Sequence, residues 1–301
     1  MAIVLGPNRY GKAEVRLVRV TRTTATEHEM ADLNVSVSLS GDLADTHLRG
    51  DNAHVVPTDT MRAVVYAFAQ DEPLPAIEAF GLRLARHFVD AYTPIDTARV
   101  RVREYPWIRV PGTHGPHPHA WTRAAGSRYA GVVHGPAGTE VCSGLADVTV
   151  LKSTGSEFHG FLTDRYTTLA PTRDRVLATS VHACWRHRRD EGDEGGGTPT
   201  DWDASFGATR DTLLRTFAET HSLSLQQTLY TMGEAVLTER GEPVEVRLEL
   251  PNKHHLPVDL DAFGLHNAGE VYQVPDRPYG LIEGTVLRDD AAPALADLPW
   301  Q

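Results

Sequence analysis

The chain of 301 residues carries 29 Lys and Arg against 40 Asp and Glu, a formal net charge of −11 at pH 7. Binding to nucleic acid phosphates needs a positive surface, so this charge argues against nucleic acid as the main partner. The hydrophobic content of 41% is that of an average globular protein, and no apolar run is long enough to cross a membrane.

The first half of the sequence predicts strands, then helices, then strands. Apolar and polar residues alternate over 33–40, and a shorter strand is expected over 15–20. Pro57 and Thr58 are typical of a helix start, and apolar residues at helical spacing over 77–88 predict a second helix. Strands are expected again near 100–108 and 129–133.

The second half predicts the same order of elements. Strands are expected over 148–151 and 177–185, helices over 202–217 and 225–236, and strands over 244–250 and 281–287. The acidic, glycine-rich stretch 190–200 predicts a surface loop between the second strand and the first helix.

Two halves of the order strand, strand, helix, helix, strand, strand predict an α+β protein. Each half would form an antiparallel sheet with helices on one face. We place the two units at 1–140 and 141–301. The uncovered face of each sheet needs a partner, which a second copy of the unit or another subunit can supply.

Several common catalytic motifs are absent from the sequence. It holds no GxxxxGK or GxGxxG phosphate-binding loop, no GxSxG elbow and no HExxH pair. Cys142 and Cys184 form no CxxC pair, and we expect both to be reduced and structural in a cytoplasmic protein. Residues 1–12 lack the basic-then-apolar pattern of a signal peptide.

Two groups of histidines are candidate metal ligands or catalytic residues. His114, His117 and His119 lie within six residues and could bind a metal, but the surrounding Pro and Gly predict a loop, and no Cys or carboxylate lies beside them. We therefore predict no metal site. His254 and His255 are adjacent, and on a strand they would point to opposite faces, so the two cannot easily serve one site.

Segments spread along nearly the whole chain carry a resemblance to one family. They are Tyr10-Gly11-Lys12, Val55 to Met61, Tyr105-Pro106-Trp107, Leu151 to Phe161, Tyr166 to Leu169 with Asp174-Arg175, Gln226-Gln227-Thr228, Pro251 to His255 and Tyr279 to Val286. Each alone is weak evidence. Together, in this order and at this spacing, they resemble the urate oxidase (uricase) family.

The resemblance implies a fold, an assembly and a reaction. The fold is the T-fold, a doubled ββααββ unit, and members form homotetramers that enclose a tunnel, with active sites at subunit interfaces. The implied reaction oxidises urate with O2 and water to 5-hydroxyisourate and H2O2. Urate supplies the electrons, so neither a metal nor a flavin is implied.

The resemblance also assigns residues that hold urate, a flat heteroaromatic anion. Phe158 matches the residue that stacks on the ring, and Arg175 matches a guanidinium that can bind two acceptors. Gln226 matches the amide at the opposite edge, while Leu225 and Ile282 match residues that line the pocket.

A second set matches the side of the site where oxygen reacts. Lys12 matches a base that acts through the hydroxyl of Thr58, which requires that its pKa be lowered from about 10.4. Thr58 and Asn252 match residues that hold oxygen or water above the ring, and His254 matches a member of the proton relay. Asp59 matches a neighbour of the substrate at the helix start.

The sequence departs from the family pattern in three places. His255 stands where some members carry an aromatic residue, and Pro257 follows it. We assign no role to the loop 190–200. The last residues lack the ending that directs proteins to peroxisomes, which favours a bacterial cytoplasmic enzyme.

Two alternatives remain open on the sequence alone. A related enzyme of the same doubled fold could act on a pterin or a guanine nucleotide through Glu157 or Glu283, in some cases with zinc. A second alternative is a purine-binding protein without turnover, against which the intact set of Lys12, Thr58 and His254 argues.

Overall fold

The computed structural model describes residues 1–71, 74–189 and 201–296, which form two compact units. Unit 1 holds the described residues of Met1–Gly144, Trp185–Phe206 and Asp290–Gln301, and unit 2 holds Leu145–Cys184 and Gly207–Asp289. Strands β7 (Gly138–Lys152) and β8 (Leu177–His187) run from one unit into the other.

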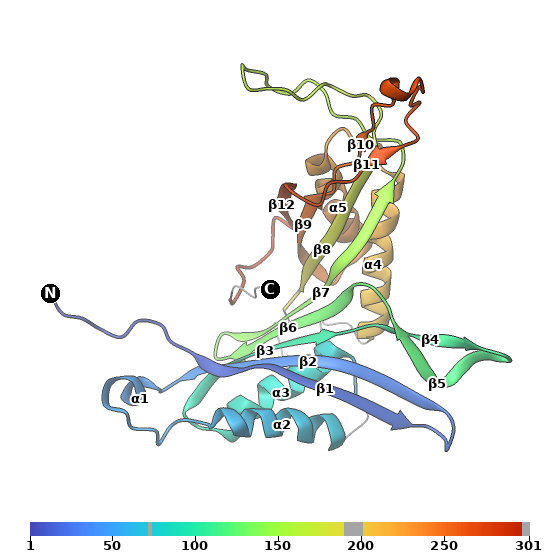
Figure 1. The fold of residues 1–301 in the computed structure, drawn as a ribbon. Coiled ribbons are helices and arrows are strands. Elements are labelled where there is room, and N and C mark those ends of the chain that lie inside the picture. Colours follow the sequence, from blue (N-terminus) through green and yellow to red (C-terminus); the bar gives the residue numbers. More distant parts are fainter. Residues whose placement is uncertain (72–73, 190–200, 297–301) are drawn as a thin grey trace. The chain divides into compact units, whose positions relative to one another are not determined.

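Unit 1 is an antiparallel sheet with helices on one face. Its strands are β1 (Tyr10–Arg22), β2 (His28–Gly41), β3 (Ile95–Glu104) and β6 (Ser127–Gly135), hydrogen bonded in that order and followed by the start of β7. Its helices are α1 (Ala44–Arg49), α2 (Thr58–Asp71) and α3 (Ile77–Ala91). Figure 1 shows α2 and α3 on the same side of β1, β2 and β3.

The core of unit 1 lies between that sheet face and the two long helices. Leu33 and Leu39 of β2 are fully buried, as are Phe80 and Phe88 of α3. The alternation along β2 and the helical spacing along α3 therefore select the buried residues, as the sequence predicts. Burying side chains of this size is the main favourable contribution to folding.

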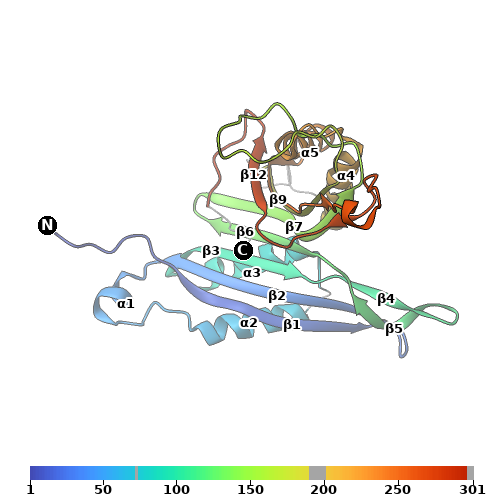
Figure 2. The same ribbon diagram turned by 45° about the horizontal axis from the view of Figure 1, so that its top comes forward.

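A hairpin of β4 (Trp107–Gly112) and β5 (Gly115–Arg123) follows β3. It projects beyond the ends of β3 and β6 in both views (Figure 1 and Figure 2). The predicted loop at His114 to His119 was therefore wrong, because His117 and His119 lie on β5. Pro111 and Pro116 pair with each other near the hairpin turn. Prolines are tolerated at such edge positions, although they hide the strand pattern in the sequence.

Unit 2 repeats the arrangement of sheet and helices. Beside the end of β7 and most of β8 it contains β9 (Pro243–Asn252), β12 (Gly280–Leu287), α4 (Trp202–Glu219, shared with unit 1) and α5 (Leu225–Glu239), with β10 (Leu256–Pro257), η1 (Asp261–Phe263) and β11 (Tyr272–Gln273) between β9 and β12. Helix α5 packs closely on β12: a Cβ added at Gly233 would lie 2.6 Å from Val286 Cγ2.

The eight main strands follow the order β1-β2-β3-β6-β7-β8-β9-β12, and the α+β prediction is confirmed. The predicted unit boundary near residue 140 falls in the first residues of β7 and stays a prediction. The predicted loop 190–200 lies outside the described residues. Cys142 and Cys184 are buried and free of disulfides. No helix in the described ranges has the length and apolarity needed to cross a membrane.

A buried ion pair lies in unit 1. Glu78 of α3 is fully buried, and its carboxylate lies 2.7 Å from Arg128 Nη2 on β6. It also accepts a hydrogen bond of 2.7 Å from the Ser143 hydroxyl, which lies 3.0 Å from His187 Nε2. Asp203 contacts the other Arg128 nitrogen at 2.5 Å. Burial raises the pKa of Glu78, and Arg128 opposes that rise.

The final described residues belong to unit 1. The Leu295 backbone N–H lies 3.2 Å from the Glu140 carboxylate on β7. Arg188 contacts Asp290 at 3.3 Å, and Arg189 donates to the Pro293 carbonyl at 3.0 Å. After passing through unit 2, the chain therefore returns and completes unit 1.

Candidate functional site

Tyr10 joins the start of β1 to the segment that precedes α2. Its hydroxyl donates to the Val56 carbonyl at 3.0 Å and accepts from the Val56 N–H at 2.7 Å. Burial raises the pKa of Tyr10, and the Val56 hydrogen bond opposes that rise. Lys12 lies two residues after Tyr10 on β1, and Thr58 lies two residues after Val56. This double hydrogen bond therefore connects the segments that carry two of the three predicted catalytic residues, Lys12 and Thr58.

A β-bulge follows Lys12. The register between β1 and β2 shifts between Lys12 and Val15, and Glu14 takes a φ of 59°. Ser36 Oγ accepts from the Glu14 N–H at 3.1 Å, and the Glu14 carboxylate accepts from the Asn34 amide. A bulge changes the direction of a strand and re-aims nearby side chains, and Lys12 is the last paired residue before this one.

Thr58 and Asp59 are the first two residues of α2, and both are exposed. The helix begins with a hydrogen bond of 3.2 Å from the Met61 N–H to the Pro57 carbonyl. Asp59 pairs with Arg62 at 2.6 Å. An acidic side chain in the first turn is favourable to the helix dipole, which gives Asp59 a structural reason to be there.

In unit 2, the loop between β7 and β8 carries Phe158. The Glu157 N–H donates to the Ser222 carbonyl at 2.7 Å, and the Ser222 N–H donates to the Gly155 carbonyl at 2.9 Å. Phe158 and Thr172 exchange two backbone hydrogen bonds of 2.9 Å. Backbone contacts on both sides therefore fix Phe158, although the loop has no regular secondary structure.

Arg175 lies against Phe158. Its backbone N–H donates to the Ser156 carbonyl at 2.9 Å, and its Nε donates to Ser156 Oγ at 3.2 Å. The guanidinium carbon lies 5.2 Å from the Phe158 ring centroid. Burial lowers the pKa of Arg175, but a guanidinium keeps its charge in proteins. Among the described residues, no carboxylate forms an ion pair with it.

The start of α5 holds Leu225 and Gln226. Ser224 caps the helix by accepting from the Gln227 N–H at 3.1 Å. Leu225 is buried, whereas Gln226 is exposed. Thr228 donates to the Ser222 hydroxyl at 2.8 Å. Ser222 therefore anchors both the loop of Phe158 and the start of α5. These contacts bring four predicted substrate-binding residues to one region of unit 2: Phe158, Arg175, Leu225 and Gln226.

Asn252 and Ile282 lie on the neighbouring strands β9 and β12, both half-buried. Asn252 is paired with Gly280, and Ile282 with Leu250. His254 and His255 follow the end of β9 at Asn252, so the argument that a strand would point them to opposite faces does not apply to them. The chain leaves β9 there, and the Lys253 N–H donates instead to the Ala178 carbonyl of β8 at 2.9 Å.

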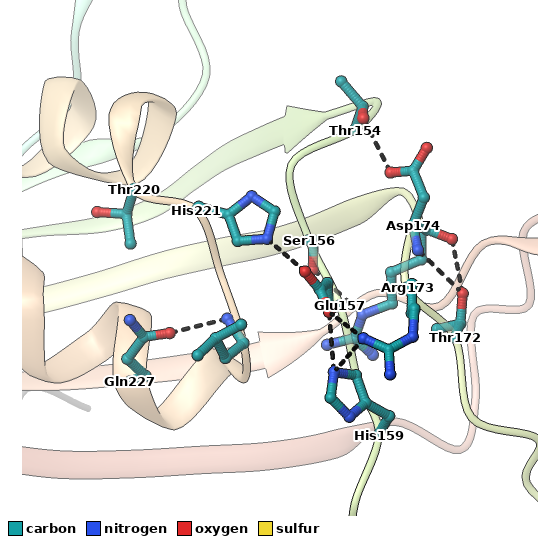
Figure 3. A network of polar contacts seen from close by, with 12 residues as sticks. Thr154, Ser156, Glu157, His159, Thr172, Arg173, Asp174, Thr220, His221 and Gln227 are labelled. Carbon is teal, nitrogen blue, oxygen red and sulfur yellow. Dashed lines mark hydrogen bonds and ion pairs between the residues drawn. The ribbon is translucent and has the colours of Figure 1, made fainter.

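Sequence reasoning did not identify the contacts of Glu157. Figure 3 shows its carboxylate between two histidines: one oxygen lies 2.7 Å from His221 Nε2 and the other 2.9 Å from His159 Nε2. Hydrogen bonds from His221 and then His159 lower the pKa of Glu157. His221 lies 64 residues away along the chain, so no local pattern could have revealed this contact.

The histidines of the β4–β5 hairpin contact one another and the β1–β2 turn. The rings of His117 and His119 lie 4.5 Å apart, and His119 Nδ1 lies 3.1 Å from the Thr26 carbonyl. In the described part of the chain, no group of three or more His, Cys, Asp or Glu side chains is arranged to hold a metal ion.

The unit 2 residues offer the chemical groups that suit a flat anion. The half-buried Arg175 guanidinium lies over the Phe158 ring, and Phe158 also stacks on Phe161 with ring centroids 5.0 Å apart. Nearby, α5 begins with an exposed amide at Gln226. A planar ring would use the aromatic face, and acceptor atoms on its edge would use the guanidinium and the amide.

Comparisons with known proteins agree over nearly the whole chain. The uricase family model matches residues 8–134 and 141–283. A uricase of Arthrobacter globiformis is 48% identical over 289 residues, which cover 95% of this chain and 91% of the relative. A uricase of Aspergillus flavus is 37% identical, covering 93% and 95%. The crystal structure of the Arthrobacter globiformis uricase aligns with a TM-score of 0.89 at 47% identity, covering 98% of each chain.

Proposed function

Since the chain belongs to the uricase family and is a urate oxidase, we propose that it oxidises urate with the residues that the sequence singles out. Phe158 stacks on the purine ring, Arg175 binds its acceptor atoms, and Gln226 binds the opposite edge. Leu225, Ile282 and Asp59 line the pocket. The observation that carries this assignment is the half-buried Arg175 guanidinium, which lies over Phe158 and has no carboxylate partner among the described residues.

Lys12, Thr58 and His254 form the catalytic set in this proposal. Lys12 removes a proton from bound urate through the Thr58 hydroxyl, and His254 passes protons at the oxygen side. Thr58 and Asn252 hold oxygen or water above the ring. The Tyr10–Val56 hydrogen bonds support the pairing of Lys12 with Thr58, because they connect the two segments. The β-bulge directly after Lys12 also supports a role for this residue, because bulges are common next to active sites, where they re-aim side chains.

The proposed reaction needs no group other than the two substrates and water. Urate, O2 and water give 5-hydroxyisourate and H2O2. The electron pair comes from urate, which is oxidised, and O2 is reduced to peroxide. The site then has to bind the anion, remove its proton and keep oxygen over the ring, and the assigned residues offer a suitable group for each of these tasks.

We further propose that the enzyme is a homotetramer with its active sites at subunit interfaces. β1 and β12 end the strand order, so each has one edge without a neighbour in the described chain. Such edges are usually paired or covered in native assemblies. Exposed apolar side chains on β1, such as Val18 at 56%, fit a surface that another subunit covers.

The alternative of a pterin or guanine nucleotide substrate is less well supported. That alternative requires a free carboxylate, for which the sequence offers Glu157 or Glu283. In the structure, the Glu157 carboxylate is already hydrogen bonded to two histidines, His221 and His159. An amide at Gln226 and a cation at Arg175 suit an anionic ring better.

The proposed reaction is tested by mixing the protein with urate in air after treatment with a chelator. We expect urate absorbance to fall and H2O2 to form in equal amounts, at the same rate before and after chelation. Loss of activity on chelation, restored by added zinc, would contradict the cofactor-free reaction. Binding of urate without oxygen consumption would instead support a purine-binding protein.

Arg175→Ala is expected to raise the KM for urate about 30-fold or more, because charge-assisted hydrogen bonds contribute roughly 1.5–3 kcal/mol each. Arg165→Ala is the matched control: it removes the same side chain from the same loop, at an exposed position where the guanidinium contacts the neighbouring Tyr166. Its KM should change by less than about threefold. Steady-state kinetics measure both. Equal KM values for the two variants would contradict the role of Arg175.

A further inference from the structure

The carboxylate of Glu157 joins two segments of unit 2 that carry different parts of the proposed urate site. One is the loop with Phe158 and Arg175, and the other is the turn between α4 and α5, which leads into Leu225 and Gln226. We call the three side chains His221, Glu157 and His159 the carboxylate clamp. Figure 3 shows them between the turn and the loop.

Only one of the two histidine contacts crosses between these segments. His221 lies in the turn, and its Nε2 donates to Glu157 Oε1 at 2.7 Å. His159 lies two residues after Glu157 in the same loop and contacts Oε2 at 2.9 Å. The first contact therefore adds a side-chain link between loop and turn to the backbone hydrogen bonds of Ser222, whereas the second orients the carboxylate from within the loop.

The turn itself is held from the other side by Lys152 at the end of β7. Lys152 Nζ donates to the Phe217 carbonyl at 3.3 Å and to the Thr220 carbonyl, at the C-terminal end of α4. Burial lowers the pKa of Lys152. A cation at this end of a helix is favourable to its dipole. His221 directly follows Thr220, so it projects from a fixed backbone.

The side chains of the clamp are too exposed for it to be a major source of stability. His221 is 57% exposed and His159 36%, while Glu157 is 17% exposed. Ion pairs and hydrogen bonds at such exposure contribute little to folding because water competes for both partners. Their effect on geometry is larger, since the backbone atoms of Glu157 lie directly before Phe158, which is the proposed stacking residue.

We propose that Glu157 and His221 are positioning residues for urate binding: beside the backbone bridge at Ser222, their contact restrains how the Phe158–Arg175 side of the pocket is oriented towards the Leu225–Gln226 side. This inference rests on the proposed assignment of the urate site. Without the contact, the loop keeps its backbone bridge to Ser222, but the orientation of the following residues is less restricted. Loss of positioning reduces substrate binding when the two edges of a planar ring can no longer be contacted together.

The test compares two single substitutions that each remove one histidine from the same carboxylate. His221→Ala is expected to raise the KM for urate about tenfold, with kcat changed by less than about twofold. His159→Ala should change KM by less than about threefold, because it breaks a contact within one loop. Glu157→Leu should raise the KM for urate by about the same factor as His221→Ala, because it removes the other partner of the same contact. His221→Gln, which keeps an N–H donor, should restore most of the affinity.

Folding and site assignment are controlled separately. Near-ultraviolet circular dichroism and the melting temperature of each variant show whether the fold is kept, and binding of the non-oxidised purine xanthine measures affinity without turnover. An unchanged KM in folded His221→Ala, or an equal rise in His159→Ala, would overturn the clamp. If Phe158→Ala also leaves KM unchanged, the urate site itself is wrongly placed. If only Phe158→Ala raises KM, the site stands and the clamp fails.

Discussion

Lys12→Met is expected to lower kcat for urate about 100-fold or more while KM changes by less than about threefold. Methionine has nearly the same length and shape as lysine but cannot accept a proton. A general base contributes roughly 10²–10⁴ to the rate of a step that transfers a proton, and stacking and hydrogen bonding of urate do not depend on it. Steady-state kinetics over a range of urate concentrations separate the two effects.

Lys12→Arg distinguishes proton removal from simple charge. Arginine keeps the positive charge near the bulge of β1, but its guanidinium does not lose a proton at accessible pH. If Lys12 is the base, Lys12→Arg should be nearly as slow as Lys12→Met, and an added small primary amine should restore part of the rate to Lys12→Met. A Lys12→Arg enzyme with wild-type kcat would show that only the charge matters.

Arg128→Met is expected to reduce the free energy of unfolding by about 3–5 kcal/mol, because it leaves the fully buried Glu78 carboxylate without its cation. Typical domains have only about 5–15 kcal/mol in total, so the variant should be close to unfolding at moderate temperature. Urea unfolding followed by tryptophan fluorescence measures the change, at a fixed protein concentration since an assembly also contributes.

The loss in free energy of unfolding caused by Arg128→Met should depend on pH in a defined direction. Burial already raises the pKa of Glu78 in the folded protein, and removal of Arg128 raises it further. A carboxyl with a raised pKa favours the folded state below its unfolded pKa, and this contribution is lost as pH rises. The deficit should therefore be largest near neutral pH and smaller towards about pH 5.

Two companion variants test the cause of this loss. Arg128→Lys keeps a cation and should be destabilised less, although lysine cannot contact Glu78 and Asp203 with separate nitrogens as Arg128 does. The double variant Arg128→Met with Glu78→Gln removes the unpaired charge and should recover much of the stability. Equal urea midpoints for the double and single variants would show that lost packing, rather than charge, explains the effect.

Elements with a regular pattern could be predicted from the sequence. The alternation along β2 and the helical spacing of α3 identified the residues that the structure buries. Strand ends were harder to predict. β1 begins at Tyr10 rather than near Val15, and its first residues were missed because they lack a buried apolar pattern. The β4–β5 hairpin was missed since its prolines resemble those of a loop. The strand that was predicted to end at Leu250 continues to Asn252 in the structure, because Pro251 and Asn252 still pair with β12.

Long-range polar contacts were beyond the sequence. The resemblance identified Phe158, Arg175 and Gln226, but it did not identify what holds them. Glu78 and Arg128 are separated by 50 residues, and Glu157 and His221 by 64. Such pairs depend on how strands and helices are brought together, which no local periodicity specifies. The bulge at Glu14 was equally hidden, since a φ of 59° is unusual for a glutamate.

The return of the chain to unit 1 has a consequence for how the protein forms on the ribosome. Residues 290–296 contact Glu140, Arg188 and Arg189, so unit 1 lacks these contacts until those residues have been synthesised. Unit 2 is complete at Asp289 and can close first. Unit 1 thus gains these polar contacts only after all of unit 2 has been synthesised, whereas its buried core, which lies within residues 15–202, is already present in a nascent chain stalled before residue 290.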